Sequence, residues 1–280
     1  MSKIDISREA LFDLYCSKKL NAYEISKKLN VGSTTIYRFL KKYSIKTRTA
    51  SECHIKYRRT SFSRNEAEKA YLIGFRLGDL YVRKAVNTKG CKTIRIEAHT
   101  TKPNQIKLFN FLFNKYGHVH IKKILSKGVK TIRGLCFLDD SFSFLLPKKD
   151  KIEDWILNDI SLFLSFVSGY IDAEGNISIN SSSGRPQLAI QTQDEKIIKS
   201  IHLGYRKYGF HSPKPIIARK AGYFSKGYQD RKSNKDHWSV AIYKIDSLRK
   251  ILEKLELKHP KRKSDAQKVL KYINEKWKIK

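Results

Sequence analysis

The sequence predicts an α+β fold built from two pseudosymmetric repeats of the form αββαββα, preceded by a small all-α domain. Three observations predict it: an apolar segment that occurs twice, alternating apolar and polar residues after each copy, and a helix-turn-helix pattern near the N-terminus. The repeats would form one saddle with antiparallel sheets. We expect the helix-turn-helix domain at 1–45, a basic linker at 46–66, the first repeat at 67–160 and the second at 161–280.

The charge of the chain indicates its partner. There are 58 Lys and Arg against 26 Asp and Glu, a formal net charge of +32. Such an excess makes a polyanion the expected partner, and double-stranded DNA is favoured over an anionic membrane surface or a ribosomal RNA contact. From Lys41 to Arg64 basic and hydroxyl residues dominate without periodicity. This predicts a linker that either follows the DNA backbone or is a solvated tether.

The N-terminal region 7–43 predicts three helices, with helix-turn-helix spacing within 23–40. The apolar positions expected inside are Ile25, Leu29, Val31, Ile36 and Leu40. Gly32 is expected to make the turn and Ser33 to cap the second helix. The exposed positions suited to phosphate and major-groove contacts are Ser33, Thr34, Thr35, Tyr37 and Arg38. An ordinary three-helix bundle is the alternative.

The duplicated apolar segment occupies 72–80 and 167–175, and alignment of the copies places Asp79 on Glu174. Small residues recur four positions apart in each copy, namely Gly74, Gly78, Gly169 and Ala173. At that spacing they share a helical face, and small faces let two helices approach closely. We therefore expect a packed helix pair with both acids at the same end.

Two carboxylates at helix C-termini face each other and the negative ends of two helix dipoles. Like charges at close range raise a pKa unless a cation relieves them. Hard divalent ions such as Mg²⁺ favour carboxylate and carbonyl oxygens. The pair Asp79 and Glu174 therefore predicts a metal site built across a pseudo-twofold axis.

These paired segments resemble the signature of LAGLIDADG homing endonucleases in their single-chain, two-repeat form, and the similarity of layout runs from about Ala67 to the C-terminus. The last acid of each signature matches Asp79 and Glu174. The first copy departs from the pattern at two positions: it has Leu80 where the family usually has glycine, and Leu77 where the second copy has Asp172.

The resemblance implies that Asp79 and Glu174 hold Mg²⁺, a site that Mn²⁺ or Ca²⁺ could also occupy, with help from backbone carbonyls near Gly78 and Ala173. Each half would then hydrolyse one phosphodiester per strand of a long, asymmetric DNA site. By position relative to the family's supporting lysine, the basic candidates are Lys148 or Lys149 and Lys261 or Lys263, of which we select Lys149 and Lys263 as catalytic. Two residues at matching strand ends that could position water are Thr101 and Gln193.

Each copy is followed by period-two alternation, which predicts antiparallel strands with one polar face. These strands are expected near 81–86, 93–99, 176–180 and 187–193, and after them near 118–124, 130–138, 214–220 and 237–243. Helices are expected at 102–116 and 194–208, each stopped by a glycine, and at Asp140 and Asp246. The polar-face candidates for DNA contact are Arg83, Arg95, His99, Asn176, Ser178, Asn180, Arg185, Gln187, Gln191 and Gln193, with Lys226 and Arg231 in a longer loop of the second repeat.

Other classes are excluded by missing motifs. The cysteines form no CxxC pair, the histidines form no HNH-like or zinc cluster, and there is no Walker-type loop or G-x-S-x-G. With no signal-peptide pattern and no apolar run of membrane-spanning length, we expect a soluble intracellular protein, in the cytoplasm or a nucleoid-like compartment. The function expected is a monomeric, site-specific DNA endonuclease without an obligate protein partner. The alternatives are a non-cleaving DNA-binding regulator and a maturase that binds intron RNA.

Overall fold

The computed structural model describes residues 5–48, 57–86, 91–126, 128–146, 148–224 and 232–277. The chain divides into two compact units, Met1–Arg58 and Arg59–Lys280. No helix in these described ranges is both long and apolar enough to cross a bilayer.

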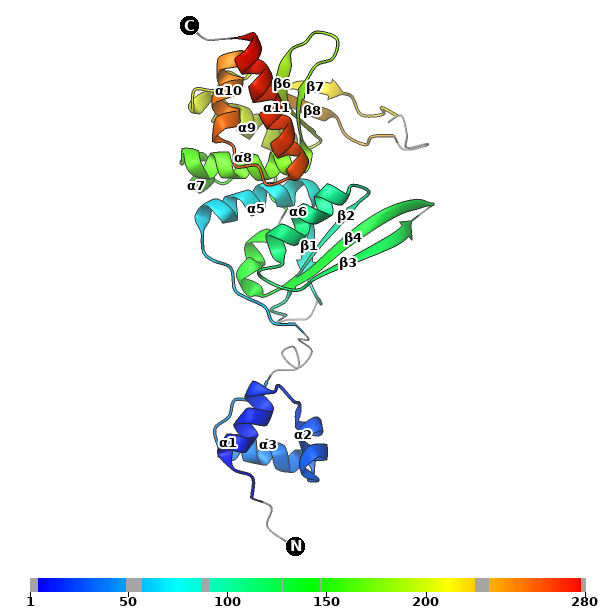
Figure 1. The fold of residues 1–280 in the computed structure, drawn as a ribbon, viewed down its shortest axis with the longest axis vertical. Helices are drawn as coiled ribbons and strands as arrows, with labels where there is room; N and C mark the ends of the chain where they lie inside the picture. Colours follow the sequence, from blue (N-terminus) through cyan, green and yellow to red (C-terminus); the bar gives the residue numbers. More distant parts are fainter. Residues whose placement is uncertain are drawn as a thin grey trace. The chain divides into compact units, whose positions relative to one another are not determined.

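The first unit is all-helical (Figure 1). It consists of α1 (Arg8–Phe12), which continues as a π-helical turn η1 (Asp13–Ser17), then α2 (Ala22–Leu29) and α3 (Ser33–Lys42). Ile25, Ile36 and Leu40 are fully buried in its core, as the pattern predicted, and Leu29 and Val31 are partly buried against it.

The turn between α2 and α3 differs from the prediction. Asn30 adopts the left-handed conformation with φ 51°, whereas Gly32 is extended at φ −71°. Asparagine tolerates the left-handed region, so it can end a helix as glycine does. Gly32 is the N-cap of α3 and no side chain caps it, so the prediction that Ser33 is the cap was wrong: Ser33 is the first helical residue.

The second unit is organised around α5 (Glu66–Asp79) and α8 (Ile160–Glu174), which lie side by side (Figure 1). The Asn65 and Asp159 side chains cap their N-termini. A Cβ added to Gly74 would lie 2.1 Å from the carbonyl oxygen of Phe166, and one added to Gly169 would lie 2.0 Å from that of Tyr71. The helices therefore touch backbone to backbone, as the small residues predicted.

Two four-stranded antiparallel sheets flank this helix pair. The first, in the order β1-β2-β4-β3, contains β1 (Tyr81–Lys84), β2 (Ile94–Thr100), β3 (Val119–Ser126) and β4 (Val129–Leu138). The second, in the order β5-β6-β8-β7, contains β5 (Gly175–Ile179), β6 (Pro186–Thr192), β7 (Ile216–Arg219) and β8 (His237–Ile242). The matching strand orders confirm the predicted α+β fold of two repeats.

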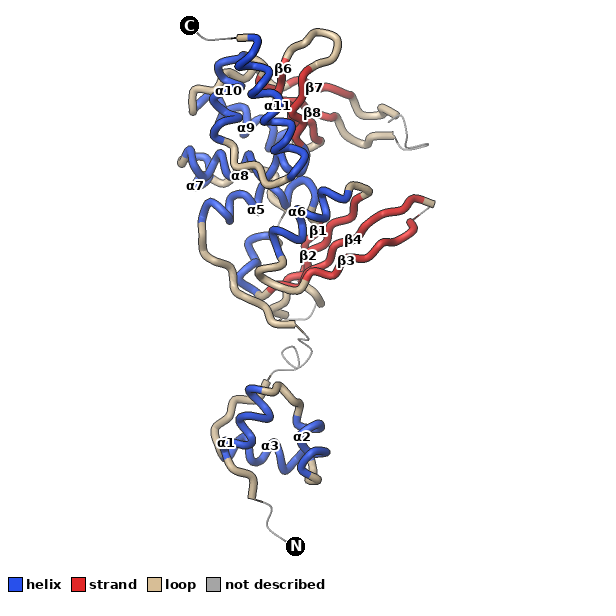
Figure 2. The backbone as a smooth tube through the Cα atoms, viewed as in Figure 1, coloured by secondary structure: helices blue, strands red, loops and turns tan. Residues whose placement is uncertain are grey.

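The helices gather on one side of both sheets (Figure 2). In chain order these are α6 (Pro103–Phe113), the 3₁₀ helix η2 (Asp140–Leu145), α7 (Asp154–Leu157), α9 (Glu195–Lys207), α10 (Ile245–Lys254) and α11 (Pro260–Lys276). The helix predicted at Asp140 is thus a short 3₁₀ segment. The final helix, α11, was not predicted.

Both ends of the segment expected as a linker are packed. Arg48 stacks 4.4 Å over the Tyr15 ring in the first unit. Phe62 is buried in the second unit, where its N–H donates to Ser141 Oγ at 2.8 Å. These parts of the expected linker therefore belong to the two compact units.

Candidate active site

Asp79 is the last residue of α5 and Glu174 the last of α8. A Cβ added to Gly78 would lie 2.5 Å from Ala173 Cβ and 2.8 Å from Glu174 Cγ. The close approach of the two helices therefore brings both acids to one end of the pair.

The carboxylates lack sufficient positive charge around them. Burial raises the pKa of Asp79 to about 7, and the charge of Glu174 adds to the shift, while Lys102 and Arg262 oppose it. The Glu174 side chain is exposed to solvent. Desolvation of its carboxylate by the surrounding protein, together with the charge of Asp194, nevertheless raises its pKa as well. At both acids the surroundings therefore make the charged form less favourable than it is in water, a cost that a bound cation would offset.

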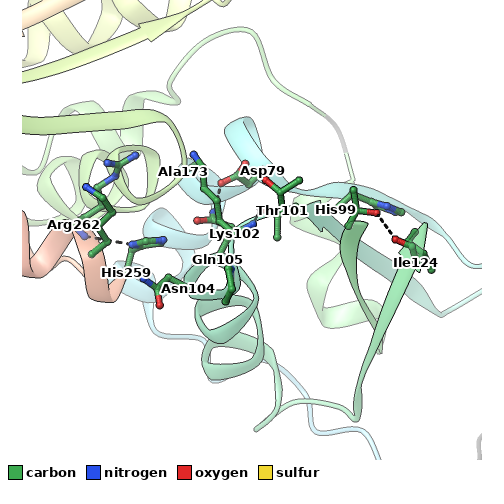
Figure 3. A pocket seen from close by; sticks show the side chains of 14 residues that line it. Asp79, His99, Thr101, Lys102, Asn104, Gln105, Ile124, Ala173, His259 and Arg262 are labelled. Atoms are coloured by element: carbon green, nitrogen blue, oxygen red, sulfur yellow. Dashed lines mark hydrogen bonds between the residues drawn. The ribbon is translucent and has the colours of Figure 1, made fainter. Parts of the chain in front are cut away.

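Asp79 lies at the edge of a pocket of about 870 Å³ whose walls come from α5, the end of β2, α6 and α11 (Figure 3). The Gln105 side-chain amide donates a hydrogen bond to Asp79 Oδ2. Lys102, Arg262 and His259 line the same pocket. Burial and these neighbouring cations lower the pKa of His259 to about 4, so it is neutral at physiological pH.

The surroundings of Glu174 differ from those of Asp79. The cation that most opposes the rise in its pKa is Lys148, whose Nζ lies 3.4 Å from Asp194 Oδ2. The third residue of α9 is the buried Ile197, where the third residue of α6 is Gln105. The two halves of the site therefore share a backbone arrangement, but different side chains surround their acids.

The two predicted catalytic lysines have different surroundings. Lys149 Nζ pairs with Glu153 at 2.6 Å, and Lys263 is exposed on α11. Lys148, the alternative to Lys149, faces Glu174 instead, whereas Lys261 pairs with Asp265 at 2.6 Å. The cations that act on both acids are Lys102 and Arg262. Sequence reasoning missed both, although Lys102 directly precedes the helix-starting Pro103.

Asp172 holds the start of α11, and hence Arg262, in place. It is 1% exposed, and its Oδ2 accepts from Tyr71 Oη at 2.6 Å and from the backbone N–H groups of Lys258 and His259 at 2.7 and 3.1 Å. One carboxylate thus joins α5, α8 and α11. The first copy, with Leu77 at this position, has no equivalent.

Replacing Asp172 with leucine should destabilise the second unit by about 3 kcal/mol, because two buried donors and one part-buried donor lose their acceptor. Asp172→Asn is the matched control: it retains one acceptor oxygen and removes a charge whose burial raises its pKa, so it should cost less. Urea denaturation followed by tryptophan fluorescence measures both variants. Equal midpoints for Asp172→Leu and the unmodified chain would contradict this role.

The predicted DNA contacts fall into three groups. In the first unit Thr34, Tyr37 and Arg38 are exposed, and Ser33 and Thr35 partly so. On the open faces of the sheets the exposed or partly exposed residues are Arg83, Arg95, His99, Asn176, Ser178, Gln187 and Gln191. At the rim of the second sheet lie Asn180, Arg185 and Gln193, and Lys226 and Arg231 lie outside the described residues.

Two rim residues have structural partners. Asn180 Oδ1 accepts from the N–H groups of Ser182 and Ser183, so it caps a turn. The Gln193 amide donates to Ser233 Oγ at 3.1 Å. A ligand contact through the Asn180 oxygen or the Gln193 nitrogen would have to replace these bonds.

No protein-family model and no curated protein matches the chain. Similar solved structures include the N-terminal LAGLIDADG domain of DUF199/WhiA, at 16% identity and TM-score 0.45 over 72% of this chain and 89% of that one. I-DmoI in complex with DNA and Ca matches at 18% and 0.46, over 72% and 98%. I-WcaI bound to its DNA recognition sequence matches at 16% and 0.49, over 74% and 88%. In fold, the chain is similar to LAGLIDADG proteins, the resemblance that its paired apolar segments indicated.

Proposed function

We propose that this chain is a site-specific endonuclease that hydrolyses both strands of a DNA duplex with divalent ions held by Asp79 and Glu174. The observation that carries the proposal is the acid pair itself: two carboxylates with raised pKa values at one end of a backbone-to-backbone helix pair. Two polar sheet faces flank that pair, in a chain of net charge +32.

The residues fit a hard divalent ion such as Mg²⁺, Mn²⁺ or Ca²⁺. Carboxylate oxygens are its preferred ligands, and the raised pKa values of both acids support the binding of a cation there. The backbone carbonyls near Gly78 and Ala173 are further candidate ligands. When bound, such an ion would stabilise charge on the scissile phosphate and assist the attacking water.

The chain's own groups have separable roles around this chemistry. Lys102 and Arg262 face both acids and can neutralise the phosphate that enters between them. Gln105 holds Asp79 through its amide, and Asp172 fixes the helix that carries Arg262. Because one chain supplies both acids, a monomer suffices.

A non-cleaving DNA-binding regulator is the second candidate. The observation that favours it is α3 of the first unit, which exposes Thr34, Tyr37 and Arg38 along one helix. Side chains of these types contact phosphates and base edges, so this unit can bind DNA without any help from the acid pair.

Selection of cut molecules from a library of randomised duplexes with Mg²⁺ or Mn²⁺ tests the nuclease proposal. The unmodified protein should cut an enriched sequence in both strands. Asp79→Asn and Glu174→Gln should bind that sequence with similar affinity and cut it at least about a hundredfold more slowly. Asp150→Asn, a change at an exposed carboxyl, is the control and should cut normally. Tight, sequence-specific binding without cleavage under either metal would favour the regulator.

A further inference from the structure

The open face of the first sheet contains an unexpected buried acid. Glu97 in β2 is 5% exposed, although the strand alternation places it on the polar face. Arg95 Nε lies 2.5 Å from Glu97 Oε1, and Arg133 of β4 donates from Nε to Glu97 Oε2 at 2.8 Å. His99 Nε2 lies 3.5 Å from the same oxygen. Three cationic or titratable side chains thus surround one carboxylate.

This carboxylate is ionised and fixed. Burial alone would raise the pKa of Glu97, but the hydrogen bonds from Arg133 and Arg95 outweigh it and lower the pKa. With an ionised acid between them, both guanidinium groups lose the rotational freedom that exposed arginines usually have. Recognition by a group that is already ordered costs less entropy on binding.

The two arginines differ in what remains free for a ligand. Arg133 uses both Nε and Nη2 on Glu97. Arg95 approaches Glu97 through Nε, and none of the hydrogen bonds or ion pairs among the described residues uses its two Nη groups. Its side chain is 21% exposed. A planar guanidinium with both Nη groups available matches the O6 and N7 acceptors of guanine in the major groove.

Among the described residues, the second sheet lacks this cluster. β1 pairs Tyr81 with Glu97, and β5 pairs Asn176 with Ala189 at the corresponding register. β2 and β6 also have the same burial pattern, so Ala189 occupies the place of Glu97 and Gln187 that of Arg95. At matching positions the first sheet therefore presents Arg95 held by Glu97, and the second sheet presents the neutral amide of Gln187.

We propose that Glu97 makes the first sheet selective for guanine: Arg95 reads the base, and Glu97, supported by Arg133, holds Arg95 in the reading orientation. The second sheet imposes no equivalent requirement, so the DNA site carries a guanine in one half only. This inference rests on the part of the proposed function in which the sheets face duplex DNA, and it does not require cleavage.

The test is selection of bound duplexes from a randomised library by the full chain, with EDTA present so that none is cut. The unmodified protein should enrich sequences with one strongly preferred G·C pair. Arg95→Lys retains the charge but loses the paired N–H donors of the guanidinium, so the preference for guanine at that base pair should fall about tenfold or more. Glu97→Gln retains the shape and loses the charge. It should lower the preference for guanine at the same base pair severalfold without weakening nonspecific binding.

Gln187→Ala, at the matching position of the second sheet, is the control. It should leave the Arg95-dependent pair unchanged, and thermal melting verifies that every variant is folded. The inference is overturned if Arg95→Lys and Glu97→Gln leave all base preferences intact, or if they relax both halves of the site equally. Enrichment of no sequence would remove this inference together with specific recognition. An Arg95-dependent guanine in a protein that cuts nothing with Mg²⁺ would support it and remove only the nuclease proposal.

Discussion

Replacing Gly169 with alanine is expected to unfold the second unit or to destabilise it by more than about 4 kcal/mol, a large part of the 5–15 kcal/mol typical of a domain. Helix propensity alone predicts the opposite, because alanine is better than glycine inside a helix by about 1 kcal/mol. The added Cβ would lie 2.0 Å from the Tyr71 carbonyl oxygen and 3.0 Å from Phe75 N. Neither backbone atom can move unless α5 separates from α8. The clash therefore outweighs the gain in helix propensity, and the substitution is destabilising.

Tryptophan fluorescence follows this unit selectively, since Trp155, Trp238 and Trp277 all belong to it. Gly32→Ala is the matched control: it lies in the first unit, where the added Cβ would meet only Thr35 Oγ1 at 3.9 Å. Its tryptophan transition should coincide with that of the unmodified chain. A Gly169→Ala protein that melts at the normal temperature would show that the helices do not touch as the structure describes.

The features that the sequence could predict are those set by residues close together in the chain. The small residues of the paired segments predicted the helix pair and the placement of Asp79 and Glu174 at one end of it. Period-two alternation predicted the strands. Both depend on short repeats that can be read directly.

The missed features depend on contacts between distant segments. Arg262 acts on the acids because Asp172 of α8 holds the backbone at the start of α11, whereas the basic sequence of α11 resembles a solvated tail. Glu97 is buried because Arg133, from a strand that pairs with β2 only in the folded sheet, covers it. Lys149 and Lys148 are neighbours in sequence, and only the fold decides which faces Glu174.

Asparagine at position 79 is expected to stabilise the metal-free protein by up to about 4 kcal/mol near pH 8, and by almost nothing near pH 4. The pKa of Asp79 is raised from 3.8 to about 7 in the folded state. Between these values the folded state binds more protons than the unfolded state, so the free energy of unfolding falls as pH rises. Asparagine does not titrate and avoids this loss.

Other groups titrate in the same range, so the informative quantity is the difference between the two proteins at each pH. His259 acts in the opposite direction: its pKa is lowered from 6.5 to about 4, so its contribution to stability is lost as pH falls through that window. It is common to both proteins and cancels. Asp150→Asn, at an exposed carboxyl, should give a difference that stays flat between about pH 5 and pH 8.

A divalent ion should oppose this difference in stability at high pH. Millimolar MgCl₂ near pH 8 supplies the charge that Asp79 and Glu174 lack, so it should raise the melting temperature of the unmodified protein more than that of Asp79→Asn. Near pH 5 a proton occupies Asp79, and the ion must displace it, so the gain should shrink. The measurement is tryptophan-detected melting in MgCl₂ and in EDTA at both pH values. If Mg²⁺ stabilises both proteins equally, the ion binds elsewhere, and the assignment of Asp79 as a metal ligand fails.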